Sequence, residues 1–487
     1  MQKDLMNGMK KVLVVFLVCF LALITYMAYF TVFQAPTIAD RSDNKRLWAK
    51  RNEVLRGTIY DRDGKALTKS ERGDTLTQKR EYVYGDLFTH SLGFVDIKYG
   101  ITGLESAYDN ELMNTKNTMF NIKEALKTFN LKEAFSNRQT KEKIGNSLGT
   151  TLDYDLQKIA YDALGDNKGS VVVLDPKTGD VITMISKPTY DPNNLEANWA
   201  DINTNEDSPL LNRATQGMYP PGSVFKIVTA ASALENISGV TNKVFHDNTG
   251  KIDFGGGYSL SNYGGTVYGD LNLKDGFRKS SNVVFGTLAL ELGNQKLRKT
   301  AEDFYFNKSI PSDGFSIAKG RFPTLESYEK GNIAQSGIGQ SSILVSPMQM
   351  ALVASTIANN GVMMEPKIVK NILNADGEIV NTIKDKEVST VIPGDDAKLI
   401  ACYMKEVVDN GTVRSSYFSG TNAAGKTGTA DHMDKDGKPA SPHSWFVGFA
   451  PYNNPKYAIA VIVENGGVGG GKAAQIAGTV LKAAVNQ

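Results

Sequence analysis

The residues best suited to chemistry are a serine and a lysine that follow a Pro-Pro-Gly turn. Ser223 comes directly after the turn, and Lys226 lies three residues later in an apolar run that predicts a buried helix. At helical spacing the two side chains share one face, one turn apart. A serine hydroxyl becomes a good nucleophile when a base removes its proton, and an amine whose pKa is lowered by apolar surroundings can be that base. The pattern predicts an acylated serine, Ser223, activated by Lys226.

The same pattern also has a structural interpretation, in which Ser223 caps the helix and Lys226 extends its amine to solvent. Matching letters recur at residues 316–319 and 327–330, so the pattern alone does not identify a site. Two later segments help to decide between these interpretations. Ser280-Ser281-Asn282 begins 57 residues after Ser223, and Lys426-Thr427-Gly428-Thr429 begins 203 residues after it. In this order the three patterns resemble the S-x-x-K, S-D-N and K-T-G signature of serine β-lactamases and penicillin-binding proteins, which favours the catalytic interpretation.

The first of these segments offers groups that can move protons. Ser280 can relay the proton taken from Ser223 to a leaving amine. Asn282 can donate a hydrogen bond to a substrate carbonyl or hold Lys226 in place. We therefore predict Ser223, Lys226, Ser280 and Asn282 as the catalytic residues.

The second segment offers groups that can bind an anion. Lys426, together with Thr427 or Thr429, can bind a terminal carboxylate. The backbone N–H groups of Ser223 and Thr429 can form an oxyanion hole. We predict Lys426, Thr427, Gly428 and Thr429 as the substrate-binding residues, with no metal ligand among the site residues.

Similar letters elsewhere in the chain are not interpreted as a site. Residues 42–44 (SDN) resemble the Ser280-Ser281-Asn282 segment but lie beside an apolar segment. Residues 177–179 (KTG) repeat the start of the Lys426 segment, but they lie within a hairpin turn ahead of Ser223. Residues 420–427 match a phosphate-binding loop letter for letter. The segment after them is polar and contains Gly437 and Pro439, so it cannot form the helix on which such a loop places its phosphate.

Composition narrows the class of protein. The chain of 487 residues has 54 basic and 52 acidic residues, and this balance gives no reason to expect a nucleic-acid partner. Cys19 and Cys402 suggest neither a disulfide framework nor a metal site. The four histidines form no zinc-hydrolase pattern; His432 and His443 are expected in a solvated loop rather than in a zinc site.

The chain divides into a membrane anchor and two modules. Residues 12–33 carry no charge and are long enough to cross a bilayer. We expect a cytoplasmic tail over residues 1–11, a single-pass transmembrane anchor over 12–33, a membrane-proximal support domain over 34–148 and a catalytic domain over 149–487. Lysines precede the anchor, but more basic residues follow it within 20 residues, so loop charge alone leaves the orientation open.

Local patterns place the site residues on elements. We expect an amphipathic helix over residues 43–55 and a helical piece over 121–129. A strand, an Asp-Gly turn and a second strand are expected over residues 56–67. In the catalytic domain the sequence predicts helices over 154–164, 347–359, 397–408 and 473–484. Strands are expected over 170–175, 180–185, 444–450 and 457–464, the last two in an antiparallel sheet with the segment at Lys426.

Taken together, these motifs resemble those of the class B penicillin-binding proteins, the monofunctional peptidoglycan D,D-transpeptidases. The resemblance covers nearly the whole chain from the anchor on. It is carried by the three motifs above and by the segments 56–64 (RGTIYDRDG), 103–105 (GLE), 219–223 (YPPGS), 336–340 (SGIGQ), 346–351 (SPMQMA) and 445–451 (WFVGFAP). The support module is short, and no glycosyltransferase module fits ahead of residue 150.

The resemblance implies an α+β fold, in which the catalytic domain is a five-stranded antiparallel sheet flanked by helices, with a helical subdomain. It implies cross-linking of stem peptides ending in D-Ala-D-Ala through a Ser223 acyl-enzyme, and inhibition by β-lactams that mimic this terminus. No cofactor is implied. A polytopic lipid-II polymerase is the implied partner, and the cell membrane with an extracytoplasmic catalytic domain is the implied location.

Three other functions remain open at this point. A D,D-carboxypeptidase or β-lactamase could use the same fold, although no E-x-x-L-N pattern lies between Asn282 and Lys426 to supply a base for deacylation. A β-lactam sensor would need an effector that eleven residues ahead of the anchor cannot provide. A scaffolding role, in which the anchor and support domain recruit a polymerase, is compatible with catalysis.

Overall fold

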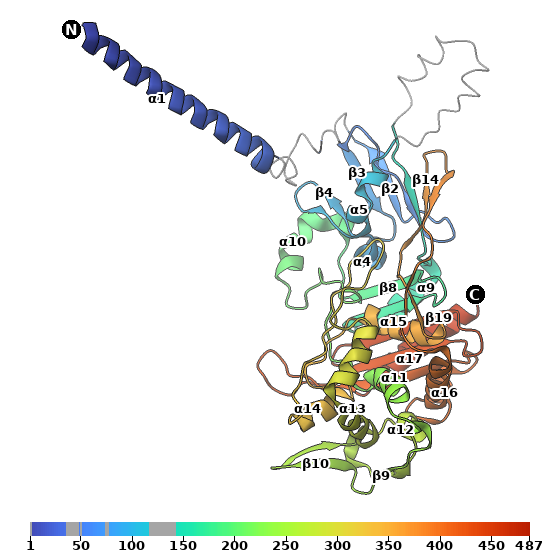
Figure 1. Cartoon of the computed structure of the whole chain (residues 1–487). Coiled ribbons are helices and arrows are strands. Elements are labelled where there is room, and N and C mark those ends of the chain that lie inside the picture. Colours follow the sequence, from blue (N-terminus) through green and yellow to red (C-terminus); the bar gives the residue numbers. More distant parts are fainter. Residues whose placement is uncertain (1, 36–47, 49–50, 74–76, 116–142) are drawn as a thin grey trace.

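The computed structural model describes residues 2–35, 48, 51–73, 77–115 and 143–487. Helix α1 (Gln2–Tyr29) continues into a π-helical turn, η1 (Phe30–Gln34). Within the described residues Met6–Gln34 is the one helix long and apolar enough to cross a membrane, and none of its central residues is buried. It stands apart from the folded body in Figure 1. The expected anchor over 12–33 lies inside this helix, which begins earlier because residues 2–11 are also helical.

The support module is built from short strands and helices. Its elements are β1 (Ile59–Tyr60), β2 (Thr68–Arg72), β3 (Gln78–Tyr82), η2 (Gly85–Phe88), α4 (Thr89–Leu92), β4 (Val95–Asp96), β5 (Gly100–Ile101), α5 (Gly103–Ala107) and α6 (Asp109–Leu112). The expected turn is present, and the Asp61 carboxylate accepts the N–H groups of Asp63 and Lys65. The strands beside it are shorter than expected: β1 covers two residues, Ala66 forms a single bridge to Tyr60, and β2 begins only at Thr68. The helix expected over 43–55 falls largely, and that over 121–129 wholly, outside the described residues.

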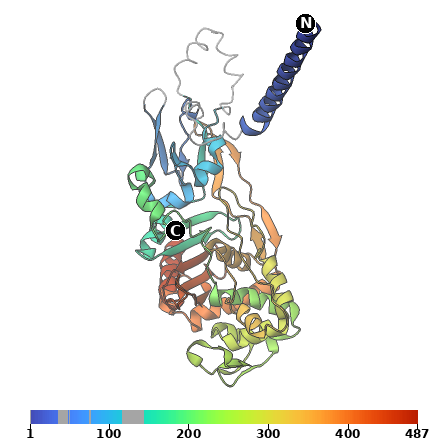
Figure 2. The same cartoon turned by 90° about the vertical axis from the view of Figure 1, so that its left-hand side faces the viewer.

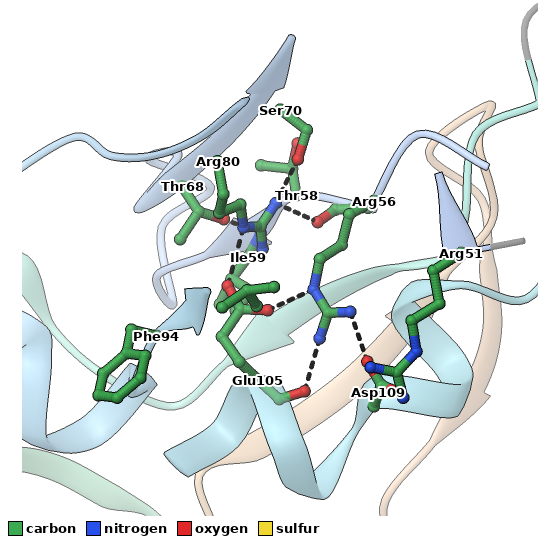
Figure 3. A network of polar contacts seen from close by, with 12 residues as sticks. Arg51, Arg56, Thr58, Ile59, Thr68, Ser70, Arg80, Phe94, Glu105 and Asp109 are labelled. Carbon is green, nitrogen blue, oxygen red and sulfur yellow. Dashed lines mark hydrogen bonds and ion pairs between the residues drawn. The ribbon is translucent and has the colours of Figure 1, made fainter. Parts of the chain in front are cut away.

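A buried ionic network holds this module together (Figure 3). Glu105, which is fully buried, accepts hydrogen bonds from Arg56 Nε at 2.5 Å and Arg80 Nε at 2.8 Å. Arg56 also donates to Asp109, at 2.6 Å. Burial alone would raise the pKa of Glu105, but the Arg80 and Arg56 guanidiniums outweigh it and hold that pKa below its usual range. The carboxylate therefore joins the chain at residue 56 to strand β3 and helix α5.

Replacing Glu105 by glutamine is expected to destabilise the protein by about 3–5 kcal/mol, because it leaves two buried guanidiniums without their shared anion. The folded-state pKa of Glu105 is lowered, so its contribution is complete above the ordinary carboxyl pKa and is lost as pH falls through the lowered one. Urea unfolding at pH 7 and at pH 3 should show the gap between wild type and Glu105→Gln narrowing in acid. Glu71→Gln, on an exposed position of β2, is the control. Equal stability of Glu105→Gln and wild type at pH 7 would contradict this role.

The support module and the catalytic module share a sheet. Strand β6 (Ser147–Thr150) pairs in parallel with β1 and antiparallel with β14 (Val369–Leu373), in the order β1-β6-β14-β15. β15 spans Ile379–Thr382. The expected boundary between residues 148 and 149 lies within β6, so the chain passes between the modules along a paired strand rather than through a linker.

The catalytic module is organised around a five-stranded antiparallel sheet, as predicted. Its strands, in spatial order, are β17 (Ala424–Ala430), β18 (His443–Ala450), β19 (Tyr457–Val463), β7 (Gly169–Leu174) and β8 (Val181–Lys187). Side chains alternate between its faces. Val171 and Val173 pack with α9 (Tyr154–Leu164) and α17 (Lys472–Val485), while Val172 and Leu174 belong to the larger core that contains α15 (Pro347–Ala358). Strand β17, which carries Lys426, is an edge strand.

A helical subdomain completes the catalytic module. Its helices and those that join it to the sheet are η4 (Pro192–Asn194), α10 (Leu195–Thr204), η5 (Gly222–Phe225), α11 (Lys226–Asn236), η6 (Val240–Asn242), η7 (Tyr263–Gly265), α12 (Leu273–Arg278), α13 (Asn282–Asp303), α14 (Lys330–Ser336), α16 (Gly394–Asn410) and η8 (Ser415–Phe418). The remaining short strands are β9 (Phe245–Asp247), β10 (Lys251–Gly255), β11 (Tyr258–Ser261), β12 (Gly269–Leu271), β13 (Val362–Met364) and β16 (Glu387–Thr390). In Figures 1 and 2 helices α12, α13 and α14 and strands β9 and β10 lie at the end of the molecule opposite the blue support module, with the red strands of the central sheet between them, whereas the green helix α10 lies beside the support module.

Candidate active site

Ser223 lies in the short helix η5, which leads directly into the buried helix α11. The turn before it approaches strand β17 very closely. A side chain at Gly222, which has a φ of 55°, would come within 2.4 Å of the Thr429 carbonyl oxygen, and one at Gly428 would come within 2.9 Å of the Pro221 carbonyl oxygen. Only residues without a Cβ allow this contact. The two glycines therefore bring the half-buried Ser223 against the strand that carries Lys426.

Lys226 begins α11 one turn after Ser223, and its backbone N–H donates to the Ser223 carbonyl. The side chain is fully buried. Its Nζ lies 2.7 Å from the Ser280 carbonyl oxygen, 3.1 Å from Ser280 Oγ and 2.8 Å from Asn282 Oδ1. Burial, and then the charge of Lys426, lower the pKa of Lys226 well below its usual value. Its amine is thus suited to accept a proton.

The serine and asparagine of the second motif are held by different contacts. Ser280 adopts a left-handed conformation with a φ of 55° between α12 and α13, which is uncommon for a residue with a side chain. Ser281 caps α13 by accepting the Val284 N–H. Asn282 donates through Nδ2 to the Ser261 carbonyl at 2.8 Å, while its Oδ1 faces Lys226. Its amide is therefore oriented to hold Lys226.

Lys426 reaches the same serine from strand β17. It is fully buried, and its Nζ lies 2.9 Å from Ser280 Oγ and 3.1 Å from the Thr427 carbonyl oxygen. Burial lowers its pKa to about 7. Ser280 Oγ therefore lies between two lysine amines, from Lys226 and Lys426, whose pKa values are both lowered.

Replacing Lys426 by methionine should change the pH dependence of stability. In the unfolded chain this lysine keeps its proton up to about pH 10.5, whereas in the folded protein it loses the proton at about pH 7. Folding therefore releases a proton between these values, and the cost of that release falls as pH rises. Relative to wild type, Lys426→Met should be most stabilised near pH 7, and this advantage should shrink toward pH 10. Urea unfolding at several pH values measures it, with exposed Lys438→Met as the control; pH-independent differences would contradict the expectation.

Two threonines of the Lys426-Thr427-Gly428-Thr429 motif contact loops that the sequence did not predict to be part of the site. Thr427 Oγ1 lies 2.6 Å from Thr412 Oγ1, and Thr429 Oγ1 accepts the Gly469 N–H at 3.0 Å. Thr427 and Thr429 are two residues apart on β17 and so face the same side, opposite to Lys426. Thr412 follows α16 in an irregular segment, and no local pattern distinguishes it from other loop threonines. Thr412 is recognised as part of the site only by its short distance from Thr427 in the structure.

Aromatic and ionic contacts anchor the turn that carries Ser223. Trp445 Nε1 donates to the Pro220 carbonyl at 3.0 Å. The Tyr219 hydroxyl donates to Glu464 at 2.7 Å, and Arg213 Nε donates to the same carboxylate at 2.7 Å. These partners come from strand β18 and from the residue after β19, so the central sheet fixes the position of the turn.

The expectation for the histidine loop is wrong for His443. This residue begins strand β18 and is buried, and its Nδ1 accepts the Asn465 N–H. Burial lowers its pKa to about 4, and its ring stacks on that of His432 with centroids 3.8 Å apart. Sequence analysis missed this because the strand starts two residues earlier than its apolar run. In the part of the chain that the structure describes, no cluster of three potential metal ligands forms.

The segments dismissed as chance matches lie elsewhere. Residues 177–179 are in the turn between β7 and β8, as predicted. Residues 424–430 form strand β17, so the phosphate-loop match has no helix at its end. Ser42 lies outside the described residues. Ser316 lies next to Gln216, and both residues line a cavity. None of the predicted site residues lines that cavity.

Comparisons with known proteins match both modules. Residues 169–482 match the family model of the penicillin binding protein transpeptidase domain, and residues 56–134 match that of the penicillin binding protein A dimerisation domain. The chain is 30% identical to the peptidoglycan D,D-transpeptidase PbpA of Mycolicibacterium smegmatis, over 99% of each chain.

Solved structures are similar over most of the chain. Penicillin-binding protein A from M. tuberculosis, as a ceftriaxone acyl-enzyme complex, matches with a TM-score of 0.80 and 29% identity, over 90% of this chain and 100% of that one. The D,D-transpeptidase domain of a peptidoglycan glycosyltransferase from Eggerthella lenta matches with a TM-score of 0.77 and 32% identity, over 89% of this chain and 99% of that one.

Proposed function

The chain belongs to the class B penicillin-binding proteins, the peptidoglycan D,D-transpeptidases, and on that premise we propose which of its residues carry out the reaction. The observation that carries the assignment is the meeting of three distant motifs: Ser280 Oγ lies within 3.1 Å of the amines of both Lys226 and Lys426, beside the turn that presents Ser223. Lys226 and Lys426 are fully buried, whereas Ser223 is only half-buried.

In the first half-reaction Ser223 is acylated. Lys226 takes the proton from Ser223 Oγ, which attacks the carbonyl carbon between the two D-Ala residues of a stem peptide. The backbone N–H groups of Ser223 and Thr429 stabilise the oxyanion. The C–N bond then breaks, and Ser280 passes a proton to the leaving nitrogen while it receives one from the protonated Lys226. Free D-Ala departs and the acyl chain stays on Ser223.

In the second half-reaction an amine of another stem peptide attacks the acyl-enzyme. Its nitrogen forms the new peptide bond, the ester bond to Ser223 breaks, and the proton released by the amine returns to Ser223 Oγ through Lys226. No water is consumed, and the enzyme ends in its starting state. β-Lactams acylate the same oxygen because their strained amide takes the place of the D-Ala-D-Ala bond.

The third motif binds the terminal carboxylate of the stem peptide. Thr427 and Thr429 project from the same face of β17, so their hydroxyls can both donate to the carboxylate. Lys426 projects from the other face to Ser280 and acts on the anion through its charge rather than by contact. Gly428 lets the Ser223 turn approach, and Thr412 orients the Thr427 hydroxyl.

A two-peptide assay tests this function against its alternatives. The purified protein is incubated with a D-Ala-D-Ala donor peptide and an amine-bearing acceptor peptide, and the products are separated by mass. A transpeptidase releases D-Ala and forms the cross-linked dimer in equal amounts. D-Ala release without dimer would indicate a carboxypeptidase, repeated penicillin hydrolysis a β-lactamase, and stable acylation with no peptide turnover a sensor.

The single apolar helix fits a membrane anchor. We infer that residues 1–11 are cytoplasmic, that 34–148 support the enzyme and that 149–487 act outside the membrane, where peptidoglycan is cross-linked. Protease added to intact, wall-stripped cells should digest the catalytic domain; full protection until lysis would contradict this orientation. A polytopic lipid-II polymerase is the proposed partner, and it should co-purify with the full chain but not after the span is replaced by an unrelated apolar helix.

A further inference from the structure

A cavity of about 740 Å³ lies where the support module meets the catalytic module. One wall comes from residues 89–107 of the support module, and the other from residues 190–216 and 312–316 of the catalytic module. None of the residues proposed for acyl transfer lines it. Among the described residues that do, only His90 could carry a charge, and burial lowers the pKa of His90 to about 4, so its ring is neutral at pH 7.

Aromatic rings form one part of the cavity. Tyr99 and Trp199 stack with centroids 4.0 Å apart and an angle of 16° between their planes, and Phe94 meets Trp199 edge-on at 6.3 Å. Tyr99 comes from the segment between β4 and β5, and Trp199 from α10, which lies beside β4 and α5 in Figure 1. The aromatic wall is thus shared by the two modules, and both stacked rings are partly exposed.

Neutral polar groups form the rest of the cavity wall. Gln216 Nε2 donates to the Ser316 carbonyl at 2.7 Å, which fixes the amide, and Asn212 Nδ2 donates to the His90 carbonyl at 2.9 Å. Serine and threonine residues from both modules also line the cavity. A charged peptide or a phosphate would find no opposite charge here and would lose its hydration on entry. A neutral ligand with one apolar face and many hydroxyl or amide groups matches the walls.

We propose that this cavity binds the neutral N-acetylamino-sugar backbone of the glycan that bears the stem peptides. A pyranose ring offers an apolar C–H face to the aromatic wall and hydroxyl and acetamido groups to the amides and hydroxyls. The proposal rests on the proposed function, because the peptide substrate of a peptidoglycan transpeptidase is attached to such a glycan. It adds a second substrate contact outside the acyl-transfer site.

The dimensions of the molecule agree with this arrangement. The cavity adjoins the β8 edge of the central sheet, where Ser91 Oγ donates to the Met184 carbonyl and Arg213 N–H donates to Ser186 Oγ. Strand β17, next to Ser223, is the opposite edge. Four interstrand spacings separate the edges by about 19 Å. An extended stem peptide of five residues spans about 17 Å, which is comparable to this separation, so a glycan held at one edge lies within about one peptide length of the other.

Sugar binding to the purified full chain tests the proposal. Chitotetraose, a soluble β-1,4 oligomer of N-acetylglucosamine, is titrated by calorimetry, with maltotetraose as the oligosaccharide control. Chitotetraose should bind in a saturable way and maltotetraose should not. Trp199→Ala should weaken chitotetraose binding by about tenfold or more, which corresponds to one lost stacking contact. Tyr328→Ala, at an aromatic residue that is 80% exposed elsewhere on the catalytic module, should leave it unchanged.

Two further measurements separate this site from the acyl-transfer site and from misfolding. Protein saturated with penicillin should bind chitotetraose as well as free protein does; loss of sugar binding after acylation would overturn the proposal. Penicillin acylation of Trp199→Ala reports on its fold, and Gln216→Ala replaces it if acylation is lost. The proposal would also be overturned if the wild-type protein did not bind chitotetraose, or if Trp199→Ala and Gln216→Ala bound it as tightly as the wild type. Failure of the transpeptidase assay with sugar binding intact would count against the proposed function alone.

Discussion

Replacing Ser223 by alanine is expected to abolish covalent labelling by penicillin. In the proposed mechanism the Ser223 hydroxyl oxygen forms the ester, so no partial activity should remain at this position. Intact-mass analysis after incubation with penicillin should show one adduct on the wild-type chain and none on Ser223→Ala. The structure supports this choice, because Ser223 is the serine that the Gly222 turn presents to β17.

A matched control is available within the chain. Ser327 begins another S-x-x-K match on an exposed segment, and Ser327→Ala should be labelled like the wild type. Thermal unfolding of Ser223→Ala should be close to that of the wild type, because Ser223 is only half-buried. An adduct that persists in Ser223→Ala, or that maps by peptide mass to Ser316 or Ser327, would contradict the assignment of Ser223 as the acylated residue.

Replacing Lys226 by arginine is expected to slow acylation by on the order of 10² to 10⁴, the usual contribution of a positioned base. Arginine keeps the positive charge but does not give up its proton at accessible pH. In the wild type, burial lowers the pKa of Lys226, so its neutral amine is available at lower pH than that of an ordinary lysine. The rate of penicillin acylation, followed by stopped-flow fluorescence, should rise with pH through this lowered pKa in the wild type.

The variant provides a second readout, because its residual rate should lack that rise with pH. Lys279→Arg, next to Ser280 but with its amine over the Tyr268 ring, is the matched control and should keep both the rate and the pH profile. If Lys226→Arg acylates within a few-fold of the wild type with the same profile, another group removes the Ser223 proton.

Much of the site could be predicted because its signals are local. The Ser223 helix, the β7–β8 hairpin and the strands β17, β18 and β19 are each encoded by a short pattern of turn residues and apolar periodicity. The order of the three motifs then implied that they meet. The structure also bears out the expected helix at residue 154, which Asp153 caps by accepting the Leu156 N–H.

What could not be predicted depends on contacts between distant segments without periodicity. Thr412 touches Thr427 from a loop, and the Gly222 N–H donates to the carbonyl of Gly339, more than 100 residues away. Strand β6 likewise joins the two modules only because it pairs with β14, which follows it by over 200 residues. His443 was misplaced because a buried polar residue at the first position of a strand resembles the end of a loop.

The two lysines that flank Ser280 Oγ make proton uptake by the site anticooperative. Each amine is buried, and the charge of Lys426 is one of the causes that lower the pKa of Lys226. In the proposed acylation step Lys226 takes the proton from Ser223; two ammonium groups would then face one hydroxyl, and their repulsion drives one proton onward. The nearest outlet is Ser280, and beyond it the nitrogen of the departing D-Ala. In the proposed mechanism, mutual repulsion thus gives proton transfer a direction, from the attacking oxygen toward the leaving group, without any conformational change.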